Sequence, residues 1–440
     1  MPSTHSLSEQ QQFLSSRVKT LCVALKQHKR TFGGKTLVLY HTSSEVFLIR
    51  LLAAAHAGFD IIFPANGQTE NIETASLNAD YVFVDSYKGA KQLNAEMLAA
   101  VDTNLDADHC ISALTLPQSG KLTFYTSGST GYGKPIEKNW RHINAEVANL
   151  DHTFCFEQPC QIVATVSHQH IYGLLFKLLW PLFSGHTIEF TFVEFPEQLQ
   201  SLVLEKNAVI ISSPAFIDRL IRDNVLMECK DKIIGLFSSG GPLSDISAIR
   251  LFEQLGIAAT QIYGSTETGG IAYRQVTQSA KTAWQCFDGI TVTTQEQQLA
   301  VCSPYFDEDV FITQDMVELL ENGQFMLLGR LDRTIKLEEK RVNLDALERT
   351  LCADKTIQAC KVIVLTKGKR QQLGLVASLT DYGFSELNKH GKLALNKHLK
   401  RLLSGRFEAI CMPRKFRYLA SLPVNSQGKL VFAELEKLFD

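Results

Sequence analysis

The residues with the clearest chemistry lie in one stretch, Leu122 to Pro135, which reads LTFYTSGSTGYGKP. A short apolar run enters a loop of hydroxyl-bearing residues and glycines, followed by Lys134. The loop residues are Thr126, Ser127, Gly128, Ser129, Thr130, Gly131 and Gly133. Glycine lets a backbone approach an anion closely, hydroxyls donate hydrogen bonds, and the lysine adds positive charge. Such a loop after a strand is typical of phosphate binding.

The spelling GxxxxGK from Gly128 to Lys134 also fits the P-loop of ATPases. In that motif the next residue is Ser or Thr, which binds magnesium and opens a helix. Here the next residue is Pro135, which has no hydroxyl and no N–H. The sequence therefore predicts a phosphate loop of another type, with a flexible Gly/Ser surface turn as the alternative.

A second polar loop, Tyr263 to Gly270, reads YGSTETGG and follows a short apolar run. Its single carboxylate is Glu267. Magnesium takes one or two carboxylates together with phosphate oxygens, so Glu267 beside a triphosphate is a candidate magnesium ligand. The alternative is that Glu267 caps the start of a helix.

Three further sites suit a nucleotide. Gly240, Gly241 and Pro242 form a flat wall without large side chains, which suits a planar base. Asp315 could accept hydrogen bonds from both ribose hydroxyls. Arg330 could serve the same sugar or a phosphate.

Lys429 follows Gly428 in a loop near the end of the chain. A lysine there can offset charge when a carboxylate attacks a phosphate, because both reactants are negative. The alternative is a solvated turn lysine. His168 and His170 have no third ligand at metal spacing, so we expect core or pocket histidines.

The elements that must position these residues alternate between strand and helix. Expected strands cover 36–40, 61–63, 81–84, 122–125, 161–166, 187–192, 208–212, 233–237 and 260–263, and expected helices cover 8–30, 46–57, 142–150, 171–183, 196–204, 216–221 and 247–255. This alternation predicts an α/β fold with parallel sheets and crossover helices. Ligands bind at the carboxyl ends of such strands, so strands 122–125, 161–166, 233–237 and 260–263 are expected to form one floor.

Residues 290–319 change to short strands, which indicates a small β subdomain. Beyond Asp332 a compact α+β tail is expected, with helices 343–353 and 392–404 and strands 360–365, 373–378 and 416–419. The predicted domains are therefore an N-terminal body, 1–331, and a mobile C-terminal lid, 332–440, which carries Lys429.

Composition narrows the class of protein. The 440 residues are 45% hydrophobic and 20% charged, with a formal charge of −2, so no nucleic-acid partner is indicated. The polar N-terminus and the lack of a long apolar run predict a cytoplasmic protein without a membrane span. The ten cysteines read as reduced, buried thiols.

Taken together, these segments resemble the adenylate-forming superfamily, which includes acyl- and aryl-CoA synthetases, peptide-synthetase adenylation domains and luciferases. The resemblance runs from about Leu37 to Leu430. Thr126 to Pro135 is similar to the signature phosphate loop, Ser239 to Leu243 to the adenine wall, and Tyr263 to Glu267 to Y-G-x-T-E. Thr313 to Asp315 resembles T-G-D, and Gly329 to Asp332 with Ile335 and Lys336 resembles the hinge motif.

The resemblance implies roles for individual residues. Thr266 would contact the α-phosphate, Tyr263 and Gly264 would line the nucleotide, and Glu267 would hold Mg²⁺. Asp315 and Arg330 would bind the ribose, Asp332 would be the pivot, and Lys429 would drive adenylation. His170 and Gly173 would lie at the acid pocket, whose other members are expected to be Tyr172, Ser213, Phe216 and Gly269 to Ala272.

The implied reaction has two halves. A carboxylate attacks the α-phosphate of ATP, giving acyl-AMP and pyrophosphate. The tail domain then rotates about Asp332 and admits the thiol of CoA or of a phosphopantetheine arm on an acyl carrier protein. Aromatic or hydroxyaromatic acids are favoured, because the short body leaves little room for a long channel.

Two departures concern Gln314 and Glu339, which stand where the family has glycine. They favour the alternative of a non-catalytic nucleotide- or carrier-binding module. The retained residues of the catalytic motifs argue against this alternative: Lys429, Glu267, Arg330 and Asp315. The tail is also basic: from Arg333 onward there are 21 Lys and Arg against 11 Asp and Glu, compared with 23 against 35 before it. This asymmetry suits domain–domain attraction or an acidic carrier protein.

Overall fold

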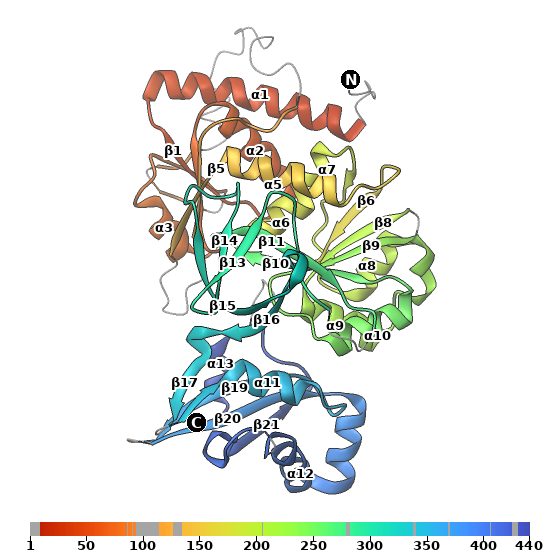
Figure 1. Cartoon of the computed structure of the whole chain (residues 1–440). Helices are drawn as coiled ribbons and strands as arrows, with labels where there is room; N and C mark the ends of the chain where they lie inside the picture. Colours follow the sequence, from red (N-terminus) through yellow and green to blue (C-terminus); the bar gives the residue numbers. More distant parts are fainter. Residues whose placement is uncertain are drawn as a thin grey trace.

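The computed structural model describes residues 9–85, 87–89, 91–93, 114–125, 134–204, 206–278, 282–337, 340–367, 370–404, 406–424 and 430–440. Figure 1 shows a body built around two sheets of parallel and mixed strands, a small antiparallel sheet beside them, and a tail below. The α/β class predicted from the alternating pattern is confirmed. None of the described helices combines the length and apolar character needed to cross a membrane.

The first sheet has five strands in the order β3-β1-β2-β4-β5, and β5 alone runs antiparallel to its neighbour. Its elements are β1 (Thr36–Leu39), β2 (Asp60–Phe63), β3 (Tyr81–Phe83), β4 (Lys121–Tyr125) and β5 (Pro135–Asn139), with helices α1 (Glu9–Phe32), α2 (Ser44–His56) and α3 (Thr69–Ser76). The apolar face of α1 packs inward, with Leu14, Val18 and Leu25 buried. Its fourth buried apolar residue is Cys22, whereas the neighbouring Leu21 is only partly buried. β5 was not predicted.

The second sheet has seven strands in the order β12-β11-β10-β9-β8-β6-β7. Neighbours from β7 to β10 are parallel, and β11 and β12 are antiparallel. The strands are β6 (Gln161–Ala164), β7 (Thr187–Ile188), β8 (Ala208–Ser212), β9 (Ile233–Ser238), β10 (Ala259–Ser265), β11 (Gly269–Gln275) and β12 (Gln285–Cys286). Every residue of β6 and β8 is buried, so both faces of these strands need apolar side chains. This is why their sequences are mostly continuous apolar runs rather than alternating ones.

Helices cover both faces of this sheet. They are α5 (Trp140–Thr153), α6 (Ile171–Gly173), the π-helix Leu174–Leu179, α7 (Trp180–Phe183), α8 (Pro196–Val203), α9 (Pro214–Asp223), the 3₁₀ segment Met227–Lys232 and α10 (Asp245–Leu255). The predicted buried helix 171–183 is present, but its middle turn is a π-helix. α10 begins where Ser244 Oγ accepts from the backbone N–H of Ser247 and ends at Gly256, which has φ 73°.

A four-stranded antiparallel sheet, β13-β14-β15-β16, follows, and it confirms the predicted β subdomain. Its strands are β13 (Thr291–Gln295), β14 (Gln298–Cys302), β15 (Phe311–Leu319) and β16 (Phe325–Arg330), with a 3₁₀ turn at Glu321–Gly323. Glu296 and Gln297 both have positive φ, which closes a tight hairpin between β13 and β14. Asp315 lies in the middle of β15.

The tail has its own hydrophobic cluster, which includes Leu347, Val362, Leu375 and Leu399. Its elements are the 3₁₀ turn Leu331–Arg333, β17 (Thr334–Leu337), β18 (Lys340–Asn343), α11 (Leu344–Cys352), β19 (Ile357–Lys367), β20 (Arg370–Leu379), α12 (Asp381–Ser404), the 3₁₀ turn Ala409–Cys411, β21 (Lys415–Leu419) and α13 (Phe432–Lys437). A separate cluster is what an independent unit requires. The division into 1–331 and 332–440 stays a prediction.

Candidate functional site

The carboxyl ends of β6, β8, β9 and β10 meet at one edge of the second sheet, because these strands are parallel neighbours. Polar or glycine-rich segments follow β6, β8 and β9, and β10 itself ends in Gly264 and Ser265. The predicted floor also contained the strand 122–125, which is β4 and belongs to the first sheet. The prediction of a single floor is therefore wrong for β4, and the chain enters the predicted phosphate loop from the first sheet rather than the second.

The phosphate-loop residues Thr126, Ser127, Gly128, Ser129, Thr130 and Gly131 lie outside the described residues, as do Glu339 and Lys429. The flanking chain is described. Tyr125, the last residue of β4, pairs with Pro135, the first residue of β5. Because Pro135 begins a strand, the loop does not open a helix as an ATPase P-loop does.

The predicted base wall, Gly240 to Pro242, is exposed at the end of β9. Gly240 has φ 83°, which favours glycine. A Cβ placed on Gly241 would meet only Pro214 Cγ, at 3.9 Å, so the backbone here is open on that side. Ser239 Oγ donates to the carbonyl oxygen of Ile262 over 3.0 Å, which ties the wall to β10.

The loop from Tyr263 to Gly270 is a tight turn between β10 and the antiparallel β11. A Cβ on Gly264 would lie 2.1 Å from the carbonyl oxygen of Gly269, so only glycine fits there. Thr266 and Glu267 are partly exposed within the turn. The alternative that Glu267 caps a helix is excluded, since a strand follows it.

The backbone of this turn is held by two buried side chains that the sequence analysis missed. Lys138 Nζ donates to the carbonyl oxygens of Glu267, over 2.6 Å, and Tyr305, over 2.7 Å. Glu146 Oε1 accepts from the backbone N–H of Gly270 over 2.6 Å. The available signal was the alternation in β5, where Lys138 shares its face with the buried Ile136.

Burial dominates the protonation of this pair. Desolvation lowers the pKa of Lys138, and the carboxylates of Glu146 and Glu267 oppose that shift. Desolvation raises the pKa of Glu146, and Lys138 and the Gly270 N–H oppose it. The two groups therefore stabilise each other's charged forms.

Asp315 is held between two elements. Tyr263 Oη donates to Asp315 Oδ2 over 2.7 Å, which joins β10 to β15. On the next strand Arg330 is the register partner of Asp315, and Arg330 Nη1 lies 3.7 Å from Asp315 Oδ1. Burial raises the pKa of Asp315, whereas the Tyr263 hydrogen bond and the Arg330 charge lower it.

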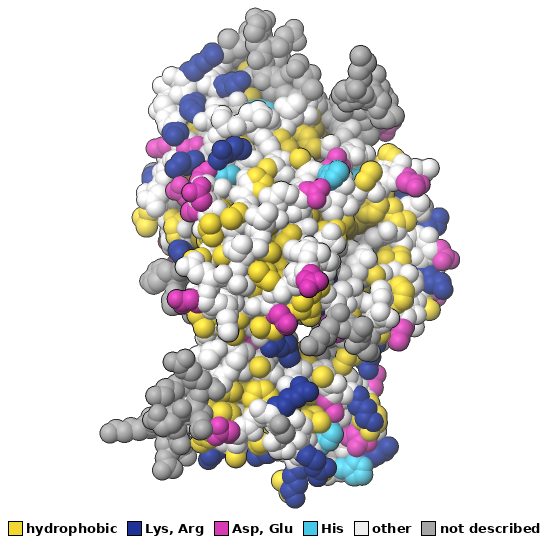
Figure 2. Space-filling view, viewed as in Figure 1, with side chains coloured by type: hydrophobic (Ala, Val, Ile, Leu, Met, Phe, Trp, Pro, Cys, Tyr) yellow, Lys and Arg dark blue, Asp and Glu magenta, His cyan; other side chains and the backbone are white. Residues whose placement is uncertain are grey.

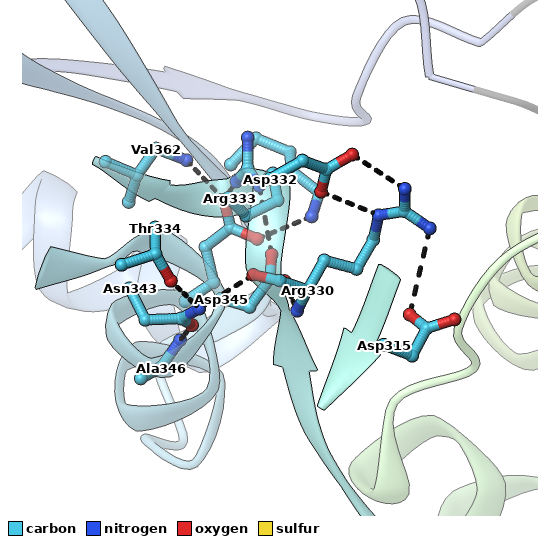
Figure 3. A network of polar contacts seen from close by, with 11 residues as sticks. Asp315, Arg330, Asp332, Arg333, Thr334, Asn343, Asp345, Ala346 and Val362 are labelled. Carbon is cyan, nitrogen blue, oxygen red and sulfur yellow. Dashed lines mark hydrogen bonds and ion pairs between the residues drawn. The ribbon is translucent and has the colours of Figure 1, made fainter. Parts of the chain in front are cut away.

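Arg330 also binds the predicted pivot (Figure 3). Its Nε donates to Asp332 Oδ1 over 2.9 Å and its Nη2 to Oδ2 over 2.7 Å, and these bonds raise the pKa of Arg330. Its backbone N–H donates to Asp345 Oδ2 over 2.8 Å, which connects the end of β16 to α11. Lys336 lies in β17, and its side chain is not among those described.

The predicted acid-pocket residues come together only in part. His170 precedes α6, and a Cβ on Gly173 would lie 2.1 Å from the carbonyl oxygen of Ser167, so the helix start packs directly on that backbone. Tyr172 Oη donates to the carbonyl oxygen of Ser212 over 3.2 Å, next to Ser213. In contrast, Phe216 and Ile271 are buried in hydrophobic clusters.

The described histidines and cysteines do not form a metal site, and His168 lies in the core. His168 is buried, its Nε2 lies 3.0 Å from the carbonyl oxygen of His41, and burial lowers its pKa to about 3, so it is a core histidine. No group of three or more His, Cys, Asp or Glu that could hold a metal ion occurs in the described part of the chain. No disulfide joins the described cysteines, and Cys155 is exposed, unlike the buried thiols predicted.

Comparisons with known proteins agree with this geometry. Residues 32–306 match the sequence model of a family described as AMP-binding enzyme. The D-alanine–D-alanyl carrier protein ligase of Lactococcus lactis is 23% identical, across 92% of this chain and 89% of that protein. The 4-coumarate–CoA ligase of Rhodobacter capsulatus is 23% identical, across 71% and 75%. ATP-bound MatB from Rhodopseudomonas palustris has the same fold, with a TM-score of 0.77 at 17% identity over 96% of this chain and 93% of that one.

Proposed function

Because this chain belongs to the family of AMP-binding enzymes, we propose that it activates a carboxylic acid with ATP and transfers the acyl group to a thiol. The first step gives acyl-AMP and pyrophosphate, and the second gives a thioester and AMP. The family predicted from the motifs is confirmed. Carrier-protein and CoA ligases among the relatives fit this pair of reactions.

One arrangement carries the proposal. Tyr263, at the end of β10, and Arg330, at the end of β16, both approach the carboxylate of Asp315. A carboxylate fixed in this way accepts hydrogen bonds from two adjacent ribose hydroxyls. The open wall at Gly240 to Pro242 follows the end of β9, the strand next to β10, and suits the base of the same nucleotide.

The residues present fit a magnesium ion bound together with ATP. Mg²⁺ takes one or two carboxylates and completes its shell with phosphate oxygens and water, so it needs no cluster of three protein ligands. Glu267 would hold it, and the ion would neutralise charge on the phosphates. Thr266, the neighbour of Glu267 in the turn, would donate to the α-phosphate.

The remaining roles fall to the phosphate loop and the tail. Thr126 to Thr130 and Lys134 would hold the pyrophosphate portion of ATP. Lys429 would approach the α-phosphate during adenylation and offset the charge that gathers in the transition state. Rotation of the tail about Asp332 would then remove Lys429 and admit the thiol.

The acid is proposed to be aromatic or hydroxyaromatic. Tyr172 and Phe176 pack with ring centroids 4.9 Å apart at the helix that follows His170. The Tyr172 hydroxyl is already bonded to Ser212, so its ring rather than its hydroxyl is available as a wall. A planar ring is the shape that such a wall accepts best.

The thiol is that of CoA or of a phosphopantetheine arm on an acyl carrier protein. The carrier fits the charge of the tail, since carrier proteins are acidic. Figure 2 shows Lys and Arg side chains spread over the tail, and those exposed on and just after α12 are Lys389, Lys392, Lys397, Arg401 and Arg406. Attraction between such a surface and an acidic carrier would raise the rate of association.

Carboxylate-dependent exchange of labelled pyrophosphate into ATP, run across a panel of acids, tests the first half-reaction. Lys429→Ala and Glu267→Gln are expected to lose exchange by about 100-fold or more, with Lys437→Ala as an exposed control. Exchange at the parental rate in both variants would contradict the mechanism. If no acid supports exchange but ATP still binds, the chain is instead a non-catalytic nucleotide-binding module.

Reversing Lys389, Lys392, Lys397 and Arg401 to Glu tests the thiol acceptor. Thioester transfer to a carrier protein should become slower and less salt-dependent, while transfer to CoA should change little. Reversing Arg17 and Arg30, exposed on α1, is the matched control. Equal transfer to the carrier by all three proteins would exclude this docking surface.

A further inference from the structure

The strand that leaves the phosphate loop is bonded directly to the turn that carries Glu267. Lys138 lies on β5, three residues after Pro135, and is 3% exposed. Its ammonium group donates to the carbonyl oxygens of Glu267 and Tyr305, from two different segments. A buried ammonium needs such acceptors, so its two bonds fix all three segments relative to one another.

Glu146 holds the other end of the same turn. It lies on α5, the helix that follows β5, and is also 3% exposed. Its Oε1 accepts from the Gly270 N–H, and a Cβ on Gly269 would lie only 2.7 Å from its Oε2. The carboxylate thus packs against a backbone that has no side chain at Gly269, where φ is 70°.

Two side chains of opposite charge therefore bind the backbone at the two ends of one short turn. The ammonium of Lys138 binds the carbonyl of Glu267, and the carboxylate of Glu146 binds the amide of Gly270, three residues later. Each bond is charge-assisted and comes from a buried side chain, which makes it stronger than a neutral bond in water. Both charges come from the chain immediately after the phosphate loop, and the turn comes from the second sheet.

We propose that Lys138 and Glu146 are positioning residues that hold the turn carrying the carboxylate of Glu267 against β5 and α5. Neither group touches the reacting atoms, and each acts through the backbone of the turn. The inference rests on the proposed function, because it gives Glu267 the role of metal ligand. Partners that orient a ligand typically change metal affinity by about 10- to 100-fold when removed.

The test measures Mn²⁺ binding by electron paramagnetic resonance, in the presence of α,β-methylene-ATP, without any acid or turnover. Lys138→Met is expected to raise the Kd for Mn²⁺ by about tenfold, and Glu146→Gln, which keeps an acceptor oxygen, by less. Lys177→Met is the matched control, because Lys177 is also a buried lysine but has no hydrogen-bond partner among the described residues. It should leave the Kd unchanged.

A double variant separates positioning from a general loss of structure. If Lys138 acts through Glu267, then Lys138→Met combined with Glu267→Gln should bind Mn²⁺ no more weakly than Glu267→Gln alone. Fully additive losses, or a parental Kd in Lys138→Met, would overturn the inference and leave the proposed function intact. A parental Kd in Glu267→Gln would instead overturn the metal role of Glu267 and this inference with it.

Lys138→Arg covers the case in which Lys138→Met does not fold. It keeps the charge and the donors but moves them on a longer, planar group, so the turn should be displaced rather than released. We expect an intermediate Kd for Mn²⁺ and faster hydrogen exchange at the Gly270 amide. A parental Kd together with parental exchange at that amide would contradict the inference.

Discussion

Arg330 and Asp332 form a two-point ion pair, with Nε to Oδ1 at 2.9 Å and Nη2 to Oδ2 at 2.7 Å. The same guanidinium lies 3.7 Å from Asp315 on the facing strand. Arg330 therefore stands between the carboxylate proposed to bind ribose and the residue proposed as the pivot of the tail. A rotation that breaks the Asp332 pair would leave Arg330 free to move toward the nucleotide.

Replacing Arg330 should weaken nucleotide binding more than chemistry. Arg330→Ala removes the positive charge beside Asp315, so we expect the KM for ATP to rise by about tenfold, with a smaller change in kcat. Arg330→Lys should not restore the parental KM, since a compact ammonium cannot reproduce the planar fork of donors that a guanidinium offers to the nucleotide. Steady-state pyrophosphate exchange measures this, with Arg222→Ala, an exposed arginine on α9, as control. A parental KM in Arg330→Ala would exclude contact with the nucleotide.

Removing the Tyr263 hydroxyl tests how Asp315 is oriented. Tyr263→Phe keeps the ring against Trp284 and Phe325 but removes the 2.7 Å hydrogen bond to Asp315. A buried hydrogen bond to a charged group contributes about 1.5–3 kcal/mol, so the KM for ATP should rise by about 10- to 100-fold. If Tyr263→Phe binds ATP normally by calorimetry, Asp315 does not depend on this bond. Tyr273→Phe, whose ring also packs in the core, is the matched control.

Glu348 is a buried carboxylate that joins several segments of the tail. Its buried carboxylate accepts from Arg333, from Lys361 and from the backbone N–H of Val362, the last over 2.8 Å. Glu348→Gln leaves two cations without their partner, so the free energy of unfolding should fall by about 3 kcal/mol in urea titrations. Glu434→Gln, which removes an exposed pair with Lys437, should cost less than about 1 kcal/mol. Equal losses in the two variants would contradict this assignment.

Lys177 should make stability depend on pH. It is fully buried in the π-helix, and burial lowers its pKa from 10.5 to about 8. The charge of Glu189 opposes this shift, and the charge of Lys177 in turn lowers the pKa of His168. Between these values the unfolded chain holds the proton and the folded chain does not, so the free energy of unfolding rises with pH in that window.

The variant Lys177→Met isolates this contribution. At pH 7 it should be more stable than the parent by about 3 kcal/mol, because the parent buries a charge there. That difference should shrink as the pH rises from 8 and vanish above 10.5. Urea unfolding across this range measures it, and a difference that does not change with pH would show that Lys177 does not titrate there.

Much of the fold could be read from local patterns. Buried parallel strands are continuous apolar runs, as in β8, and amphipathic helices carry an apolar stripe, as in α1. The antiparallel β5 escaped prediction because it is short and contains Pro135 and two charged residues. Its inward face joins Ile136 to Lys138, and the lysine obscured the alternation.

The sequence by itself predicted the chemistry that we propose: hydroxyls and glycines for phosphates, Glu267 for a metal, and Asp315 and Arg330 for a sugar. Their order along the chain also identified the family, because motif order does not depend on coordinates. Only the tertiary structure decided which groups hold these residues in place. Lys138 and Glu267 are 129 residues apart, Tyr263 and Asp315 are 52 apart, and no local pattern records a contact between them. Such contacts arise when separate sheets pack, and burial then forces each charged group to bind whichever partner that packing brings within reach.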